Sequence, residues 1–284
     1  MSESPQDKPQ RLFRFFPEVA SDFFNSKKLW FSAIEDFNDL FEVVPRYDSL
    51  VGGHLESETK KRFAFLPPEI RVDWLTYNRV MTQFTSPVYE ESMETLPIGI
   101  QKKFSETFGM VCFTENLSSL LMWGHYASCH RGFAVEFEPA HPLFQTDDFG
   151  KVDYSKHRPR VETENHRDVL HTKSPEWKYE QEHRLVMPIV ALQRATRRDG
   201  KEKPFLVLPP DSVRAVYLGC RMTEPHRSAL LEALRLTEWK HVARKVMRRH
   251  HTDYCVEPID FEKLRPVPKD AEEDLAKLWP CLGL

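Results

Sequence analysis

Two glutamates and an arginine gather at the start of a predicted strand. The segment Glu180-Gln181-Glu182-His183-Arg184 comes immediately before an apolar run. Side chains alternate between the two faces of a strand, so Glu182 and Arg184 project to the same side and Glu180 lies one step before them. A carboxylate beside a cation stays ionised, and it can stabilise a developing positive charge or hold a hydroxyl group. The spacing is therefore typical of a catalytic acidic pair, and also of an ion pair at an exposed strand end.

A second candidate group lies on a helix predicted over residues 117–131. Polar and aromatic side chains recur there at steps of four, three and four, which places these residues on one face: Ser119, Trp123, Tyr126 and His130. Such a face can stack on a flat ligand ring and hydrogen-bond its edge, or it can pack into the core. His125 and His130 lie on different faces, so the pair does not favour a metal site. Gly132 stands where a left-handed helix cap is expected.

Two further patterns carry polar side chains. Phe37-Asn38-Asp39 predicts a turn that Phe37 anchors, and Glu42 follows shortly after it. The stretch Lys240–His251 holds five lysines or arginines and three histidines. Such a stretch suits contacts with phosphates, or a solvated strand face.

The composition limits the class of protein. With 284 residues, the chain has room for one large domain or for two of about 150 residues each. Hydrophobic residues make up 40% of it and 20 residues are phenylalanine, so it can bury a core and is not a disordered polymer. A net charge of −3 excludes a polycation built to neutralise phosphates. The 10 glycines form neither GxGxxG nor a P-loop pattern, and GxSxG and HExxH are absent, so a Rossmann fingerprint or a P-loop is not expected.

The five cysteines include no CxxC pair, which favours free thiols in a reducing compartment over a disulfide scaffold or a zinc ribbon. The first ten residues lack the basic head and the apolar run of a signal peptide. The longest apolar run, Leu185–Leu192, has eight residues, whereas roughly 20 are needed to span a bilayer. We therefore expect a cytoplasmic protein with no membrane partner and no bound metal.

The chain shows no repeat, no low-complexity stretch and no Gly/Ser linker, which predicts a single domain. We place this domain at residues 11–265, with a helical insertion around residues 55–108. Residues 1–10 are expected to form a flexible polar tail. Residues 266–284 are expected to form a Pro-rich, charged tail.

Alternating segments predict strands, and apolar stripes predict helices. The predicted strands cover residues 11–16, 29–32, 111–114, 132–138, 152–154, 182–189 and 213–218, with a hairpin formed near 241–247 and 254–258. Helices are predicted from Pro67 through Phe84, over 117–131 and over 223–235. Because strands and helices mix without a regular βαβ order, the expected class is α+β, with mixed, mainly antiparallel sheets and packed helices.

The order of several short motifs resembles a known bacterial family. From about Arg11 the chain carries FRFF, LWFS, FNDLFE, CFTE, LMWGHY, HRGFAVEF and KSPEWKYEQEHR, and VRAVYLGCR ends the match near Cys220. This combination is similar to the family called domain of unknown function 2971. The resemblance implies a stand-alone bacterial protein with a role in defence or toxin modules, and it implies no established activity.

More remotely, the chain resembles the ADP-ribosyltransferase superfamily. Members of that superfamily carry an arginine or histidine on a first strand, a serine or aromatic residue on a second, and a late catalytic glutamate. In the clostridial-toxin-like branch this glutamate is the second member of an ExE triplet. Here Arg14, Ser32 and Glu180-Gln181-Glu182 follow in that order. The resemblance implies a split sheet and NAD as a substrate.

The resemblance also implies a set of residues that contact NAD: Arg14, Ser32, Trp123, Tyr126 and Arg184. Arg14 would hold the phosphate or ribose, and Ser32 would orient the site. Either Tyr126 or Trp123 would stack on nicotinamide.

In the same comparison, the catalytic residues are two glutamates together with Arg14. Glu182 would hydrogen-bond the ribose 2′-hydroxyl and stabilise the oxocarbenium-like centre as nicotinamide departs. Glu180 would orient or deprotonate the acceptor. The sequence departs from the superfamily in its second-strand motif, Phe31-Ser32-Ala33 in place of Ser-Thr-Ser, and in its insertion.

Two other classes fit the same residues. A non-enzymatic partner-binding or sensor domain would use the aromatic and acidic clusters as structure. A metal-dependent nuclease would place the basic stretch on phosphates and gather four carboxylates around Mg²⁺: Asp39, Glu42, Glu180 and Glu182. The acceptor, protein or nucleic acid, and the oligomeric state stay open at this level.

Overall fold

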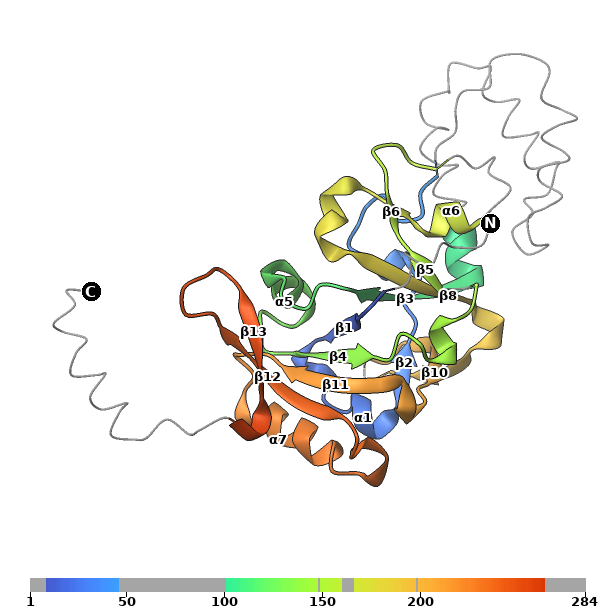
Figure 1. The fold of residues 1–284 in the computed structure, drawn as a ribbon. Coiled ribbons are helices and arrows are strands. Elements are labelled where there is room, and N and C mark those ends of the chain that lie inside the picture. The colour runs from blue at the N-terminus through green and yellow to red at the C-terminus, as the bar shows by residue number, and fades with distance from the viewer. Residues whose placement is uncertain (1–8, 46–100, 148, 160–165, 198, 264–284) are drawn as a thin grey trace, which may run out of the picture.

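We describe the protein from a computed structural model, which places residues 9–45, 101–147, 149–159, 166–197 and 199–263 (Figure 1). Most of the predicted insertion, including the helix expected from Pro67 through Phe84, lies outside these described residues. So do the first eight residues and the chain from residue 264 onward.

An eight-stranded sheet forms the centre of the described structure, in the order β13-β12-β11-β4-β1-β3-β8-β5. Its strands are β1 (Leu12–Phe16), β3 (Phe108–Thr114), β4 (Phe133–Phe137), β5 (Phe149–Lys151), β8 (Glu182–Pro188), β11 (Val213–Leu218), β12 (Ala243–Arg249) and β13 (Val256–Asp260). Neighbouring strands are antiparallel except for β11 and β12, which run parallel. The α+β class and the mixed, mainly antiparallel sheet are confirmed.

Two smaller sheets flank the large one. The first contains β2 (Lys28–Trp30), β10 (Glu202–Val207) and β9 (Gln193–Thr196), and in the second β6 (Asp153–Tyr154) runs parallel to β7 (Thr172–Lys173). Just beyond β2, Ser32 forms an isolated bridge with Met110 of β3. This bridge ties the three-stranded sheet to the large one. The sequence pattern did not predict β9 and β10, because their side chains are mostly polar or half-exposed and alternate weakly.

The helices are short. The structure describes four complete α-helices: α1 (Phe23–Ser26), α5 (Leu120–Tyr126), α6 (His166–Leu170) and α7 (Glu224–Ala233). Residues 101–107 are also helical. Among the 3₁₀ segments, Ile34–Asp36 and Pro175–Glu180 border the site described below. The helix predicted at 223–235 is confirmed as α7, with Thr223 at its N-cap position.

The helix predicted over residues 117–131 is shorter than expected. It begins after Ser119, whose hydroxyl accepts from the Met122 amide, and ends at Tyr126. Three consecutive residues with left-handed backbone follow it, Ser128 to His130. Gly132 is therefore not the left-handed cap. It is required for a different reason, because a Cβ there would lie 2.0 Å from the Phe16 carbonyl oxygen.

The two faces of β1 bury different partners. Leu12 and Phe16 belong to the larger core with α1 and α7, and the Phe16 ring stacks on Phe133 with centroids 5.0 Å apart. Phe13 and Phe15 face the other side, where α5 packs. Figure 1 shows α1 and α7 on one side of the sheet and α5 on the other. The alternation predicted for residues 11–16 is thus satisfied by apolar layers on both faces.

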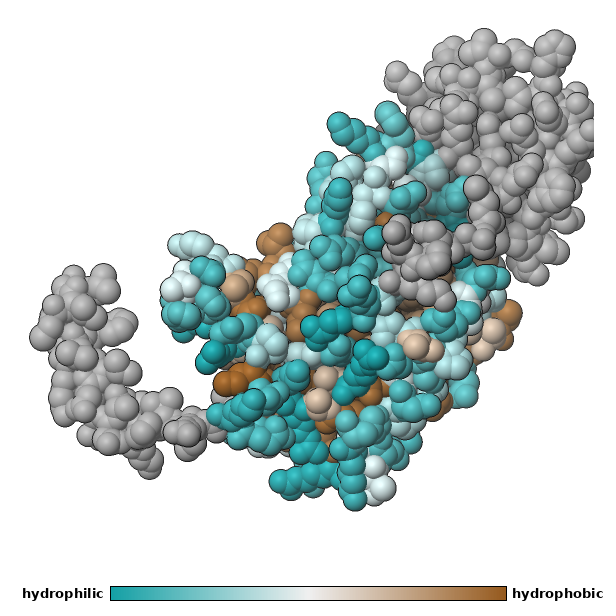
Figure 2. Space-filling model, in the orientation of Figure 1, coloured by the Kyte–Doolittle hydropathy of each residue, from teal (hydrophilic) through white to brown (hydrophobic). Residues whose placement is uncertain are grey.

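The face of the molecule seen in Figure 2 is mixed in character. Figure 2 shows hydrophilic side chains over most of the visible face, with smaller hydrophobic areas among them. Within the residues that the structure describes, no helix combines the length and the apolar character needed to cross a bilayer.

The large sheet is weakly joined between β1 and β3. All five residues of β1 pair with β4, and all seven residues of β3 pair with β8, but β1 and β3 share a single register pair, Phe13 with Thr114. The sheet therefore consists of a five-stranded block, β13 to β1, and a three-stranded block, β3 to β5. We call the line between them the block junction.

Candidate functional site

A cavity of about 340 Å³ opens at the block junction. β1, β3, β8, α5 and the turn after β2 all contribute to its wall. Its polar lining includes Arg14, Ser32, Asn38, Tyr126, Lys173, Glu180 and Glu182. A volume of this size is in the range of small-molecule sites.

Five of the seven residues predicted to act on NAD meet in this cavity: Arg14, Ser32, Tyr126, Glu180 and Glu182. They come from four separate segments of the chain, which lie 18, 94 and 54 residues apart in the sequence. The other two predicted residues, Trp123 and Arg184, do not line it, and both assignments need correction.

Trp123 belongs to the core. Its side chain is fully buried, its indole nitrogen Nε1 donates to the Leu117 carbonyl at 2.7 Å, and its ring packs edge-on against Phe15. The ring therefore has no face free for nicotinamide. On the same helix, Tyr126 is the ring that reaches the cavity, because it lies one turn nearer the helix end.

Arg184 lies behind Glu182, away from the cavity. It is fully buried, donates from Nε to Glu182 Oε1 at 2.8 Å, and donates from Nη1 to the Leu170 carbonyl at 2.6 Å. Arg184 therefore orients Glu182 instead of contacting a ligand. The prediction that Glu182 and Arg184 share one side of the strand is confirmed, but that side is buried and not an exposed strand end.

Glu182 is held as an anion. Its Oε2 accepts from Arg184 Nη2 at 3.2 Å and from Lys173 Nζ at 3.0 Å. Burial opposes ionisation, but Arg184 and Lys173 outweigh it and hold the pKa of Glu182 well below its usual range. The carboxylate is charged and fixed in place before any ligand arrives.

Glu180 differs from Glu182 in its proton affinity. Its Oε2 accepts from Lys173 Nζ at 2.6 Å, and its Oε1 accepts a short hydrogen bond from the Tyr126 hydroxyl. Burial and the charge of Glu182 raise the pKa of Glu180, against the opposing effect of Lys173. Gln181 between them has left-handed backbone at φ 45°, which links the 3₁₀ segment to β8. The two carboxylates thus sit side by side with different tendencies to bind a proton.

Lys173 and Glu42 complete the acidic cluster. Lys173 is buried, and its Nζ contacts both Glu180 and Glu182, while Glu42 Oε1 pairs with Arg184 Nη1 at 2.7 Å. Three carboxylates therefore share two cations. Burial disfavours the charged form of Lys173, but the neighbouring glutamates outweigh this effect and raise the pKa of Lys173. The motif KSPEWKYEQEHR begins with Lys173, but the sequence predicted no role for this lysine, which lies seven and nine residues before its two partners.

This arrangement bears on the nuclease hypothesis. Three of its four carboxylates do converge, but the ammonium of Lys173 occupies the position between Glu180 and Glu182 where a bridging cation would sit. Across the residues that are described, no group of three or more His, Cys, Asp or Glu is arranged to hold a metal ion. Lys173 therefore neutralises the two carboxylates that the nuclease hypothesis assigns to Mg²⁺.

Arg14 spans the block junction. Its Nη1 donates to the Cys112 carbonyl of β3 at 2.8 Å, and its guanidinium lies over the Phe16 ring. The Arg14 Nε is buried and has no hydrogen-bond partner among the described residues. Burial lowers the pKa of Arg14. An anionic ligand in the cavity would satisfy this donor, because an unpaired buried N–H is costly.

The turn after β2 supplies the remaining wall. Both backbone groups of Ser32 bond to Met110, so its hydroxyl is the group left for a ligand. Phe37 packs against a small core cluster, as predicted for the anchor of the turn, and Asn38 lines the cavity. Asn38 was predicted only as turn chemistry.

The chain matches no family model, no curated protein and no solved structure. The two family resemblances of the sequence therefore remain predictions.

Proposed function

We propose that the cavity at the block junction binds NAD and that the protein cleaves its nicotinamide–ribose bond, as an ADP-ribosyltransferase or an NAD glycohydrolase. One observation carries this proposal. Arg14, Ser32, Tyr126 and the Glu180–Glu182 pair, in the chain order typical of that superfamily, line a single cavity of about 340 Å³.

The block junction supports the same proposal. A single residue pair joins β1 to β3. This weak connection is compatible with the split sheet that the ADP-ribosyltransferase resemblance implies. The arginine of the first strand and the ExE triplet lie on opposite sides of this division, with the cavity between them.

In the proposed reaction, the bond between C1′ of the ribose and the nicotinamide nitrogen breaks, and its electron pair leaves with nicotinamide. The ionised Glu182 accepts a hydrogen bond from the ribose 2′-hydroxyl and stabilises the positive charge at C1′. Water or an acceptor group then attacks C1′ and passes its proton to Glu180, whose raised pKa suits a general base.

The binding roles follow from the side chains that remain available. Arg14 offers its unpartnered Nε to a phosphate or ribose oxygen, and the Ser32 hydroxyl orients the ribose. Tyr126 borders the cavity and places its ring beside nicotinamide, while its hydroxyl keeps Glu180 in position.

Nicotinamide release from NAD tests the proposal directly. The purified full-length protein is incubated with NAD, and free nicotinamide is measured by chromatography. Glu182→Gln should lower the rate about 100-fold or more, because it removes the negative charge that the transition state needs. The matched control is Glu136→Gln, which alters a buried carboxylate on the same sheet that pairs with Arg11 instead of lining the cavity. No release by the wild-type protein, or equal release by both variants, would contradict the proposal.

A second candidate function rests on the ion network itself. Lys173 and Arg184 engage the oxygens of both glutamates, which is also how a structural cluster in a non-enzymatic binding domain would be built. This alternative predicts that NAD leaves the thermal unfolding midpoint unchanged. NAD-dependent stabilisation that Arg14→Ala abolishes would favour the enzyme instead.

A further inference from the structure

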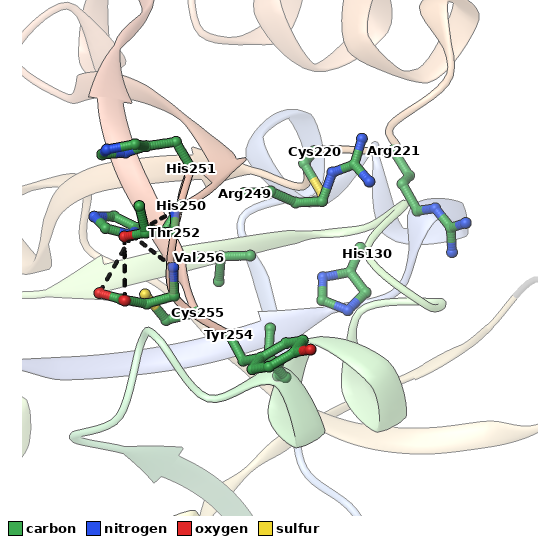
Figure 3. A pocket seen from close by; sticks show the side chains of 12 residues that line it. His130, Cys220, Arg221, Arg249, His250, His251, Thr252, Tyr254, Cys255 and Val256 are labelled. Atoms are coloured by element: carbon green, nitrogen blue, oxygen red, sulfur yellow. Dashed lines mark hydrogen bonds and ion pairs between the residues drawn. The ribbon is translucent and has the colours of Figure 1, made fainter. Parts of the chain in front are cut away.

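We propose that a second cavity, beside the β12–β13 hairpin, binds a nucleotide through its phosphate and its base. This hairpin cavity measures about 600 Å³ and is lined by Leu120 at the start of α5, by His130 in the loop after α5, by the segment after β11 and by the hairpin turn (Figure 3). The residues that carry the proposal are His130, Arg221, Arg249, His251 and Tyr254. None of them lines the first cavity, so the proposal does not depend on NAD cleavage.

The two arginine side chains of the hairpin cavity are unusual because they have no interaction partner among the described residues. The side chains of Arg221 and Arg249 have no hydrogen bond, ion pair or ring contact within the described residues, whereas every other arginine side chain there has at least one. The one carboxylate in the lining, Asp253, is engaged by His250 at 3.4 Å and by Thr252. Two guanidinium groups are thus free for an anion, and phosphate matches their geometry.

Because side chains alternate between the two faces of a strand, only part of the basic stretch 240–251 faces this cavity. Arg248 pairs with Glu257 across the hairpin, and Arg244 donates to the Leu234 carbonyl, so these two arginines are engaged elsewhere. Arg249 and the turn that follows it line the cavity. The stretch 240–251, predicted to meet phosphates as a whole, therefore reaches the hairpin cavity only through its last three residues.

His130 supports the charge argument. Its ring stacks on Trp123 with centroids 6.3 Å apart, and its carbonyl oxygen accepts from the Arg221 amide at 3.0 Å. Burial and the charge of Arg221 lower the pKa of His130. The histidine thus experiences a positive local field that a bound phosphate would reduce.

An aromatic ring stands at the mouth of the cavity. Tyr254 is fully exposed on the hairpin turn, where the structure gives it no packing partner, and His251 on the same turn is also exposed. In Figure 3, Arg221 and Arg249 lie toward one side of the opening, Tyr254 lies toward the other, and His130 is between them. Exposed rings beside arginines are the means by which proteins stack bases and hold phosphates of single-stranded nucleic acids. The ligand chemistry is therefore a nucleoside phosphate, free or within a single strand.

Binding of a fluorescein-labelled short oligothymidylate, followed by fluorescence anisotropy at low ionic strength, tests the proposal with the full-length protein. The double substitution Arg221→Ala and Arg249→Ala should weaken binding about tenfold or more, and Tyr254→Ala should weaken it by about tenfold while Tyr254→Phe retains it. The matched control is Arg194→Ala with Arg235→Ala, which removes the same charge from two exposed ion pairs elsewhere.

Competition distinguishes the two sources of the ligand. Displacement of the labelled strand by AMP identifies a free nucleotide as sufficient, whereas displacement only by unlabelled oligothymidylate identifies a nucleic-acid strand. The proposal is overturned if the wild-type protein does not bind the strand, if Arg221→Ala with Arg249→Ala binds like wild type, or if the control pair weakens binding as much. Glu182→Gln should bind the strand normally, so failure of this proposal and failure of NAD cleavage are separate results.

Discussion

The large sheet carries two buried clusters that are built from the same kinds of side chain. On β4, Glu136 accepts from Arg11 Nε at 2.9 Å and Nη2 at 3.0 Å, and from the Tyr217 hydroxyl at 2.6 Å. At the block junction, Glu180 and Glu182 likewise meet an arginine, a lysine and a tyrosine.

The two clusters differ in charge balance. One carboxylate meets one guanidinium at Glu136, and despite burial these bonds lower the pKa of Glu136. Three carboxylates share two cations at the block junction. Burial raises the pKa of Glu180 and that of Glu42, and the charge of Glu182 adds to this effect, whereas Arg184 and Lys173 lower the pKa of Glu182 despite its burial. A balanced ion pair stabilises one protonation state, whereas an unbalanced cluster beside a cavity holds two carboxylates in different states.

The largest test of this comparison removes one cation from each cluster. Lys173→Met should lower the free energy of unfolding by about 3–5 kcal/mol, because it leaves buried carboxylates unpaired. Arg11→Met should cost about 1 kcal/mol, since the Arg11 side chain is 48% exposed and water replaces it. Urea denaturation of both variants measures the difference.

A second substitution shows how much of the stability lost in Lys173→Met is due to charge and how much to packing. Glu180→Gln added to Lys173→Met should recover part of the loss, because it removes one of the uncompensated carboxylates. Equal costs for Lys173→Met and Arg11→Met, or no recovery in the double variant, would contradict the charge imbalance.

The pH dependence of stability provides a smaller test. His171 is buried close to Arg184, and burial together with Arg184 and Arg167 lowers the pKa of His171 from 6.5 to about 4. The unfolded chain therefore binds the proton first, and stability should fall by on the order of 3 kcal/mol as the pH drops from about 6.5 to about 4. His171→Gln should flatten the profile in this window. An unchanged slope in denaturation midpoints between these pH values would refute the assignment.

The smallest expected difference concerns the two tyrosines. Tyr217→Phe should cost about 2 kcal/mol, because it breaks a fully buried hydrogen bond to a charged group. Tyr126→Phe should cost less than about 1 kcal/mol, since water in the adjoining cavity can replace its hydroxyl. Thermal unfolding of the two variants compares them, and a larger loss at Tyr126 would reverse the ranking.

Much of the sheet followed from local pattern, because period-2 alternation of apolar residues identifies half-buried strands wherever it is strong. The segments that became β1, β4, β8, β11 and the β12–β13 hairpin were all predicted. β9 and β10 were missed because their exposed residues give no such signal. The helix over 117–131 was predicted too long, since the left-handed residues from Ser128 to His130 are polar or small and look compatible with a helix.

The sequence predicted which residue types form the site, but not which of these side chains are buried and which reach the cavity. Arg14, Tyr126 and the glutamate pair were selected for their chemistry, and the structure brings them together. Periodicity gave Trp123 and Tyr126 the same helix face, but only tertiary packing decides that Trp123 is buried and Tyr126 reaches the cavity. Glu42 was selected only as a possible metal ligand and Lys173 only as part of a motif. Their ion pairs with Arg184, Glu180 and Glu182 were not predicted, because contacts between distant segments cannot be recognised from local spacing.

The block junction has a mechanical consequence. Between the strands of the two blocks, separation breaks one backbone residue pair, and it leaves the pairing of β1 with β4 and of β3 with β8 intact. It also breaks side-chain contacts, among them the hydrogen bond from Arg14 to Cys112, the hydrogen bond from Tyr126 to Glu180 and the ring contact of Phe113 with Phe137. The cavity therefore lies along the line where the molecule widens with the least loss of backbone pairing. A ligand larger than the cavity could therefore be accommodated by separation of the two blocks, while the strand pairing within each block is kept.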